Sequence, residues 1–461
     1  MSIRFTLPVL FLLAALVGCS KTNEKRTDVV EEESARANTD TDETPDSDAS
    51  ADARPEEKAP NAQMANAALQ QFGTKLYQEL NQGNENDNLA ISPWSVESAL
   101  VMVAAGAKGH TLAQMLYTLG FVHIADDPDA MQTSFSALSK QLLESANKAA
   151  DDDEDAADEN NDLILHAANA IWVADHLRKE LRPAFETGLK EHHAAEVHEA
   201  PFKENADDAR KTINQWVAEH TDDKIEQLLP SGSIDAMTSM VLTNAIAFDA
   251  DWTHAFDKKN TKKAPFHLQN GKTADVNLMF REFDRVKYWQ SDDFHAVALP
   301  YESGNYAMSI VVPVEGKFDA VRSSLFEGGF ESVFVASNER SIEKVKVYLP
   351  RFQFRWKSSL TYALKQLGME NAFDDRADFS KMFKESSHRI SDVVHEVYID
   401  VDEEGTEAAA ATGAVISVTS ARVDPPKVYE VRADRPFLFA IHDTESNAPI
   451  FMGHVTNPNA K

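Results

Sequence analysis

The sequence is short of cysteine and of basic residues, and each shortage excludes a class of protein. Its 461 residues include one cysteine, Cys19, so no disulfide can form within the chain. Lysine and arginine number 45 against 75 aspartates and glutamates, which gives a formal net charge of −30. This excess of negative charge repels phosphate groups, so it argues against nucleic acid as a partner and against direct docking on an anionic membrane.

The N-terminus lacks an apolar run long enough to span a bilayer. Arg4 precedes the run Leu7–Val17, whose length is typical of a secretory signal. The run ends in Leu16-Val17-Gly18-Cys19, which resembles the lipobox of bacterial lipoproteins, where the cysteine becomes the lipidated first residue. We therefore expect residues 1–19 to be a lipoprotein signal and the protein to be exported and lipid-anchored at the bacterial cell envelope. Ser20 after the cysteine favours the outer membrane in a Gram-negative cell. The alternatives are an ordinary signal peptide or a buried free thiol.

Large apolar side chains are scarce in residues 20–60, and basic side chains are absent from residues 151–162. Neither segment can bury enough apolar surface to offset the entropy lost on ordering. We expect a disordered acidic tether over 20–60 and an acidic insertion over about 144–162. Since apolar patterns continue on both sides of the insertion, we treat 61–461 as one folded domain.

Motifs for catalysis, nucleotides and metals are also missing. The sequence has no Gly-x-Ser-x-Gly elbow, no phosphate loop and no Gly-x-Gly-x-x-Gly, so it does not predict an enzyme or a cofactor. His192, His193 and His198 lie close together, but they lack a zinc-binding spacing and cysteine partners. We expect them to be surface histidines, and we predict no metal site.

What is present is a helical first part followed by strands. Leu69, Phe72, Leu76 and Leu80 recur at helical spacing, and Ser92-Pro93 is typical of a helix start. Later segments alternate apolar and polar residues, as strands do, with helical patterns between them. This order predicts an α+β fold.

The segment 402–419 has an unusual composition. Its run of small residues permits a short helix or a plain linker, but residues 415–419 are β-branched apart from one serine. Small residues followed by β-formers suit a strand that enters a crowded sheet late, because alanine and threonine fit where leucine or lysine would not.

These residues also carry a resemblance to a known family. Residues 403–411, Glu-Glu-Gly-Thr-Glu-Ala-Ala-Ala-Ala, resemble the hinge of inhibitory serpins, and residues 433–439, Ala-Asp-Arg-Pro-Phe-Leu-Phe, resemble the signature that follows the reactive loop. Two departures are Val431, where phenylalanine is usual, and His454, where a basic residue is usual. Further matching motifs occur in family order at 88–95, 106–109, 228–230, 241–246, 299–301, 348–352, 390–395 and 451–458.

The resemblance implies a fold and a mechanism. The expected fold is the α+β serpin fold, with three β-sheets, about nine helices and an exposed reactive-centre loop over about 405–425. A protease attacks the loop as a substrate and becomes acylated, and the freed segment then enters the central sheet as a new strand. The implied hinge residues are Glu403, Gly405, Thr406, Ala408, Ala409, Ala410 and Ala411. By the period of two along a strand, Thr406, Ala408, Ala410 and Thr412 turn into the core.

The resemblance also assigns buried roles outside the loop. Ser92, Ser95, Asn244 and His395 resemble the polar cluster, or shutter, beneath which the sheet opens. Trp252 resembles the tryptophan at the breach, the point of first insertion, although Ala250 stands where a glycine is common.

The reactive bond has two candidates. Family spacing from Gly405 favours Thr419-Ser420, which suits elastase-like serine proteases, whereas counting back from Pro436 reaches Arg422-Val423, which suits trypsin-like ones. A cross-class inhibitor of papain-like cysteine proteases and a non-inhibitory binding or chaperone protein of the same fold remain alternatives. We expect a monomer that contacts the membrane through its N-terminal lipid alone. We expect no activation by heparin, because the stretch 140–162 ends in carboxylates.

Overall fold

A computed structural model gives the structure of residues 60–122, 128–147, 164–302, 305–327, 342–385, 388–406 and 427–460. These ranges lie in one unit, Glu56–Lys461. None of the helices within them is long and apolar enough to cross a membrane. Cys19 and residues 20–59 of the tether expected over 20–60 lie outside the described residues, as do residues 148–162 of the acidic insertion, whereas Pro60 is the first residue of a helix.

The N-terminal part of the unit is helical, as the apolar spacing predicts. Its helices are α1 (Pro60–Asn81), α2 (Pro93–Ala104), α3 (Gly109–Thr118) and α4 (Pro128–Asn147). Ser92 caps α2, since its hydroxyl accepts a hydrogen bond from the backbone N–H of Ser95 at 3.2 Å. Helix α3 starts at Gly109, directly after the extended residue Lys108. Helix α4 includes residues 144–147, so the first residues of the expected acidic insertion are helical.

The remaining described helices lie between strands in the chain. They are α5 (Pro183–His193), α6 (Ala206–Glu219), α7 (Phe318–Glu327) and α9 (Thr361–Gln366), with short 3₁₀ helices at η2 (Asp175–Glu180), η3 (Lys258–Asn260) and η5 (Asn371–Phe373).

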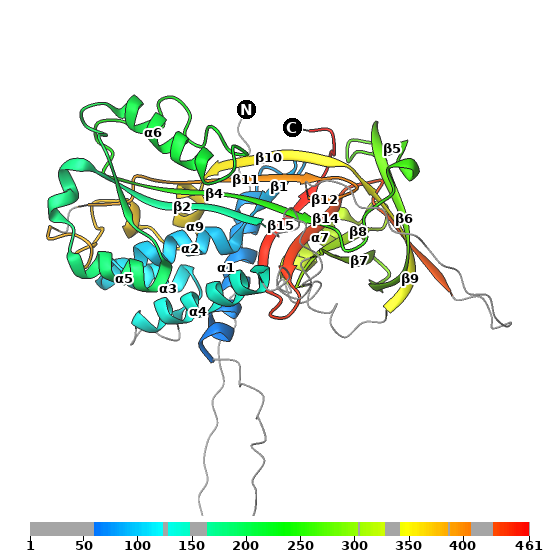
Figure 1. Ribbon diagram of the computed structural model, residues 1–461, viewed down its shortest axis with the longest axis horizontal. Coiled ribbons are helices and arrows are strands. Elements are labelled where there is room, and N and C mark those ends of the chain that lie inside the picture. The colour runs from blue at the N-terminus through cyan, green and yellow to red at the C-terminus, as the bar shows by residue number, and fades with distance from the viewer. Residues whose placement is uncertain are drawn as a thin grey trace, which may run out of the picture. The chain divides into compact units, whose positions relative to one another are not determined.

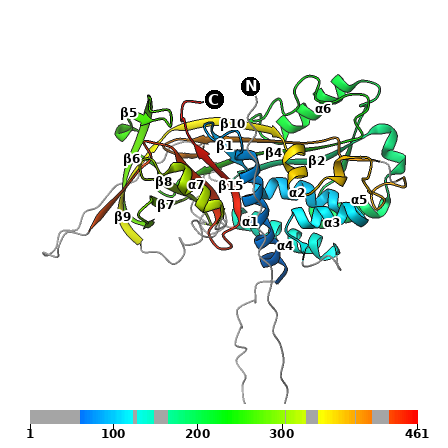
Figure 2. The ribbon, with the colours of Figure 1, turned by 180° about the vertical axis from the view of Figure 1, so that it is seen from behind.

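One sheet has six strands. Its order is β10 (Phe352–Ser359), β11 (Asp392–Val401), β4 (Met240–Asp251), β2 (Ile164–Ala174) and β3 (Val197–Ala200), with β12 (Gly405–Thr406) also paired to β4. Strands β11 and β4 run parallel at its centre, whereas β10 and β2 run antiparallel to them. The central strand β4 is buried over nearly its whole length because helices cover both faces of this sheet. Figures 1 and 2 show α6 on one face and α2 on the other.

The second sheet has nine strands. They are β1 (Leu89–Ile91), β5 (Lys262–His267), β6 (Thr273–Gln290), β7 (Phe294–Pro300), β8 (Tyr306–Pro313), β9 (Ile342–Pro350), β13 (Val428–Arg432), β14 (Phe437–Asp443) and β15 (Pro449–Val455). The long strand β6 pairs with β5 and β9 over much of its length and with β7 at its end, and its pairing to β9 is irregular between Phe283 and Val286. The sequence leads us to expect three sheets, and two of them are joined here into one nine-stranded sheet, because β6 belongs to both. If this sheet is divided at the irregularity in β6, its two parts and the six-stranded sheet make three.

The two sheets share a core. Phe248 on β4 packs against Tyr301 and against Phe451 on β15, with ring centroids 4.9 and 6.0 Å apart. The helices α1 and α2 pack against this core, and β4 at the centre of the six-stranded sheet is buried at most of its positions. Any new strand at that centre must therefore separate strands that are already packed.

Candidate functional site

A row of polar side chains crosses the middle of the six-stranded sheet. Strand register places His395 of β11 beside Asn244 of β4, and Asn244 beside Asn169 of β2. His395 and Asn244 are completely buried, as are Ser92 and Ser95 at the start of α2. The sheet and α2 therefore bring together the four residues of the expected polar cluster, and Asn169 joins them.

Hydrogen bonds connect this cluster across three strands and a helix. The amide of Asn244 donates to Ser95 Oγ at 2.7 Å and to Asn169 Oδ1 at 2.6 Å. Ser95 Oγ in turn donates to Asn169 Oδ1 at 2.9 Å. The network ties α2 to β4 and β2, so β4 and β2 cannot slide over α2 without breaking it.

His395 adds the strand β11 to the same network. The backbone N–H of Ser92 donates to His395 Nε2 at 3.2 Å, and the other ring nitrogen lies 3.3 Å from the carbonyl oxygen of Asn244. Burial lowers the pKa of His395 to about 3. The imidazole is therefore neutral, with its proton on Nδ1, and it acts as a hydrogen-bonding group between α2 and β4.

The pairing of β11 with β4 changes toward one end of the sheet. The parallel ladder ends at the pair Tyr398 and Ala247. After β11 the chain turns back, and β12 pairs antiparallel with β4, with Gly405 opposite Asp251 and Thr406 opposite Ala250. The first residues of the hinge are thus already a strand on β4.

Gly405 is required by the closeness of this pairing. A Cβ atom at this position would lie 2.1 Å from the carbonyl oxygen of Ala250 and 2.6 Å from Cα of Asp251. Both are backbone atoms that cannot rotate away, so any side chain at 405 would force β12 off β4.

Charged contacts hold the turn that precedes Gly405. Glu403 is completely buried, and its carboxylate forms an ion pair with Arg351 at 2.6 Å and a hydrogen bond with Thr261. The exposed Lys258 pairs with Glu404 at 2.6 Å. The backbone joins in, since the carbonyl of Glu403 accepts a hydrogen bond from Phe256 N at 2.7 Å.

Trp252 packs beside this turn. Its indole stacks on Tyr301 with ring centroids 4.4 Å apart, and its Nε1 donates to the carbonyl oxygen of Asp402 at 3.1 Å. Its backbone N–H donates to the carbonyl oxygen of Glu404 at 2.8 Å. Trp252 therefore holds the backbone of the turn that leads into the hinge.

Asp251 is a further residue of interest at this end. One oxygen of its carboxylate is buried without a hydrogen-bond partner, and its backbone is opposite Gly405. Burial, followed by the negative charges of Glu302, Glu404 and Asp402, raises the pKa of Asp251 to about 6. This carboxyl changes charge close to neutral pH at the point where the hinge meets the sheet.

Sequence reasoning missed Asn169, Arg351 and Asp251. Asn169 had a weak signal, as one of two strongly polar side chains in the otherwise apolar strand β2. The ion pair of Arg351 with Glu403 joins residues far apart in the chain, and no local pattern indicates it. Ala408 to Thr412, the two candidate reactive bonds at Thr419-Ser420 and Arg422-Val423, and Cys19 lie outside the described residues.

Comparison with known proteins identifies the architecture. The family model "Serpin (serine protease inhibitor)" matches residues 67–458. The chain belongs to the serpin family. This serpin is 35% identical to a serpin-like protein of Thermococcus kodakarensis, with 85% of each chain covered. It is 33% identical to the leukocyte elastase inhibitor of Bos taurus, over 86% of this chain and the whole of that protein.

A solved structure shows the same fold. The native state of the thermophilic serpin tengpin matches with a TM-score of 0.71 and 27% identity, over 88% of this chain and 95% of that one. Serpins are inhibitors rather than enzymes, and the relatives named as inhibitors support protease inhibition in general. The α+β serpin fold expected from the sequence is confirmed.

Proposed function

We propose that this serpin is a suicide inhibitor of serine endopeptidases. A target protease cleaves the loop, becomes acylated, and is trapped when the segment from Thr406 onward inserts between β11 and β4. The supporting observation is the antiparallel pairing of Gly405 and Thr406 with β4, next to the end of the parallel ladder. A strand placed between two parallel strands can pair antiparallel with both, so β12 marks the direction that the rest of the segment would follow.

The composition of the segment supports insertion rather than simple cleavage. Strand periodicity turns Thr406, Ala408, Ala410 and Thr412 inward, and none of them is large or charged. Beneath them the polar cluster must open and close again. Its hydrogen bonds are between neutral groups, so no buried charge is left unpaired when they break.

We propose Thr419-Ser420 as the reactive bond, with Arg422-Val423 as the alternative. The inserted strand must match the length of the sheet, which favours counting from Gly405, while the segment after the cut is freer to vary. This assignment makes an elastase-like serine protease the favoured target and a trypsin-like one the alternative.

The test is incubation with both kinds of protease, followed by denaturing electrophoresis and N-terminal sequencing of the released peptide. We expect a complex that survives denaturation, and a peptide that starts at Ser420 with the elastase-like enzyme. A peptide that always starts at Val423 would move the reactive bond to Arg422. Cleavage of the loop without any stable complex would support the non-inhibitory alternative, and trapping of a papain-like enzyme alone would support the cysteine-protease alternative.

We further propose that the inhibitor is held at the cell envelope through a lipid on Cys19, with residues 20–60 as its tether. A Cys19→Ala variant should leave the membrane fraction and appear in the soluble fraction, with its inhibitory activity unchanged. Equal membrane association of the variant and the wild type would contradict the anchor.

A further inference from the structure

Aspartates line both sides of the place where β4 and β11 separate. Strand β4 ends with Asp249 and Asp251, while Asp400 lies near the end of β11 and Asp402 follows it. All four are partly exposed, whereas the residues that alternate with them along the chain are buried. This alternation turns the four carboxylates toward the more exposed face of the sheet. We call these four residues the acidic entrance.

The acidic entrance has matching positions on two parallel strands. The ladder between β11 and β4 ends just before these residues, and its register, if continued, brings Asp400 level with Asp249 and Asp402 level with Asp251. Strand β12 pairs with β4 at the same level, with Gly405 opposite Asp251. Like charges at matching positions on neighbouring strands repel each other. A strand that fills the gap also removes water from between them, which makes each charge more costly.

Asp251 is disfavoured in its charged form by this arrangement. One of its carboxylate oxygens is buried and has no hydrogen-bond partner among the described residues. Burial raises its pKa to about 6, together with the negative charges of Glu302, Glu404 and Asp402. By contrast, Asp402 accepts hydrogen bonds from the backbone N–H groups of Glu404 and Gly405, at 2.8 and 3.3 Å. The turn therefore supplies donors to Asp402 but none to the buried oxygen of Asp251.

The cations at this end of the sheet serve the hinge glutamates. Lys258 of η3 pairs with Glu404, and Arg351 pairs with Glu403, each at 2.6 Å. The charges that act on the pKa of Asp251 are all negative. A proton is therefore the direct way to relieve the repulsion at Asp251.

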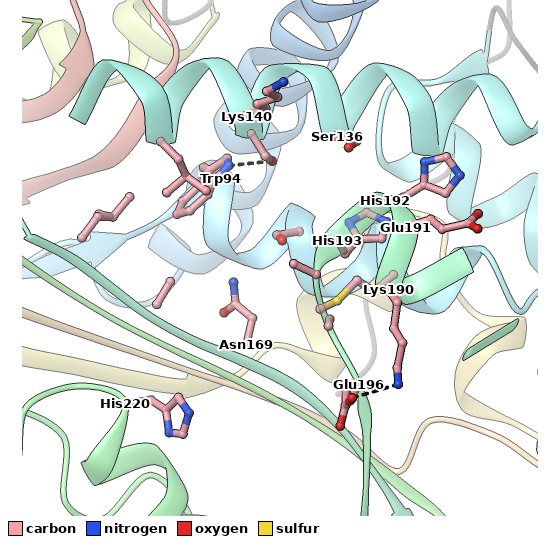
Figure 3. Close-up of a pocket in the computed structure, with 18 of the residues that line it drawn as sticks. Trp94, Ser136, Lys140, Asn169, Lys190, Glu191, His192, His193, Glu196 and His220 are labelled. Atoms are coloured by element: carbon pink, nitrogen blue, oxygen red, sulfur yellow. Dashed lines mark hydrogen bonds and ion pairs between the residues drawn. The ribbon is translucent and has the colours of Figure 1, made fainter. Parts of the chain in front are cut away.

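The polar cluster in the middle of the sheet behaves differently. Asn244 and Asn169 are neutral amides, and Figure 3 shows Asn169 in a pocket with Trp94 of α2. Burial lowers the pKa of His395 to about 3, so this imidazole stays neutral in mild acid. A change from pH 7.5 to pH 5.5 therefore alters the charge at the entrance and leaves the cluster uncharged.

We propose that the acidic entrance is a pH-sensitive switch, in which protonation of Asp251 speeds the entry of the loop between β11 and β4. An entering strand buries Asp251 further, so the inserted state holds the proton more tightly than the open state does. Insertion is therefore favoured as the pH falls. The consequence for trapping rests on the insertion mechanism proposed above, whereas the response of the sheet to pH does not.

The first experiment measures strand entry without a protease. The probe is a synthetic peptide of residues 406–418 with Glu407→Gln and blocked ends, so that it carries no titrating group. Its annealing to the intact protein is followed by native electrophoresis after incubation at pH 5.5 and at pH 7.5. We expect annealing about fivefold faster at pH 5.5. A rate that is unchanged or slower at pH 5.5 would overturn the switch, and so would no annealing at either pH.

Variants then assign the pH dependence to one carboxyl. Asp251→Asn should anneal at pH 7.5 about as fast as the wild type does at pH 5.5, with little further change in acid. A purely structural role predicts the opposite, since a more stable sheet would open more slowly. Asp251→Glu should keep the rise in rate toward pH 5.5, because it keeps a titrating carboxyl.

Two exposed residues provide matched controls. Asp292→Asn removes a carboxylate from the turn between β6 and β7, and His254→Gln removes a histidine two residues after Trp252. Both variants should respond to pH as the wild type does. If His254→Gln loses the pH dependence while Asp251→Asn keeps it, the titrating group is the histidine and the proposal is wrong.

The last experiment tests the link to trapping. The number of inhibitor molecules consumed for each trapped protease should be lower at pH 5.5 than at pH 7.5 for the wild type, and equally low at both for Asp251→Asn. Comparing the two proteins at each pH cancels the pH dependence of the protease. Equal numbers for the wild type at both pH values would overturn the consequence for trapping. If the loop is cut and no protease is trapped at either pH, the proposed function fails, while the annealing rates still decide whether the switch exists.

Discussion

The polar cluster in the middle of the six-stranded sheet and the hinge at its end both keep polar groups away from water, by opposite means. The cluster uses an amide pair, two serines and a neutral histidine, and every link between them is a hydrogen bond without charge. The hinge uses carboxylates, one paired with Arg351, one paired with Lys258, and one, Asp251, with a buried oxygen that has no hydrogen-bond partner. Disturbing the cluster therefore tests how firmly the sheet is closed, and disturbing the hinge tests how insertion starts.

The two regions also respond to acid in opposite directions. The pKa of His395 is lowered, so its contribution to stability is complete above its unfolded value and is lost as the pH falls. The pKa of Asp251 is raised, so its contribution is complete at low pH and is lost as the pH rises through about 6. Mild acid weakens the closure in the middle of the sheet and strengthens its end.

The largest effect is expected at the hinge itself. Thr406→Arg should abolish trapping, because a charged side chain would have to enter the sheet interior without a partner. The loop should still be cut, since the variant changes neither candidate reactive bond. Electrophoresis after incubation with the target protease should show cleaved inhibitor and no stable complex. Complex formation at the wild-type yield would rule out insertion from this end.

Asn244→Leu should have the next largest effect, because it removes the amide that joins Ser95 to Asn169. We expect a loss of about 2 kcal/mol in the free energy of unfolding. The loop should also insert more readily without cleavage. Thermal melting and loss of inhibitory activity on storage would measure the two effects. A double-mutant cycle with Ser95→Ala separates the pair from its surroundings, and additive losses would mean that the two residues are not coupled.

Arg351→Ala should cost less, about 1–2 kcal/mol, because the arginine is partly exposed and water partly screens the carboxylate it leaves behind. Glu403→Gln in the same chain should restore most of the loss, since no buried charge then remains. Denaturant unfolding of the two single variants and the double variant measures this. If the double variant is no more stable than Arg351→Ala, the ion pair is not what holds the turn.

Asp251→Asn should change stability by about 1 kcal/mol after allowance for the partial exposure of this carboxyl. The variant should be more stable than the wild type at pH 7.5, and the difference should shrink as the pH falls to 5, where the wild-type carboxyl is protonated. Melting temperatures across this range check it. A difference that grows toward pH 5 would have the wrong sign for a raised pKa.

The smallest expected effect is that of heparin, which should not accelerate inhibition at physiological salt. Helix α4 carries one lysine, Lys140, and this lysine is paired with Glu144. A polyanion therefore finds no basic face on α4. Rate constants with and without heparin should agree, and a large acceleration would refute this reasoning.

The fold could be predicted from the sequence because its motifs occur in order along most of the chain, and local signals such as the cap at Ser92 place individual elements. The side-chain contacts between these elements could not be predicted from the sequence. Asn169 meets Asn244 only through the register of β2 with β4, and Arg351 meets Glu403 only because β10 starts opposite the end of β11, with Phe352 opposite Val401. His193 and His198 were expected at the surface, yet both are half-buried, His193 against Gln132 of α4 and His198 against Trp216 of α6. Each of these features depends on tertiary packing, which local composition does not encode.

The close pairing at Gly405 limits which amino-acid substitutions evolution can accept in this protein. With the carbonyl oxygen of Ala250 only 2.1 Å from where a Cβ would lie, nineteen of the twenty amino acids are excluded while β12 stays paired. Both candidate reactive bonds lie beyond residue 418, so substitutions there can change the target preference while this one position stays fixed. A library randomised across 405–412 and selected for trapping should therefore return glycine at the first position and a mixture of small residues at the others.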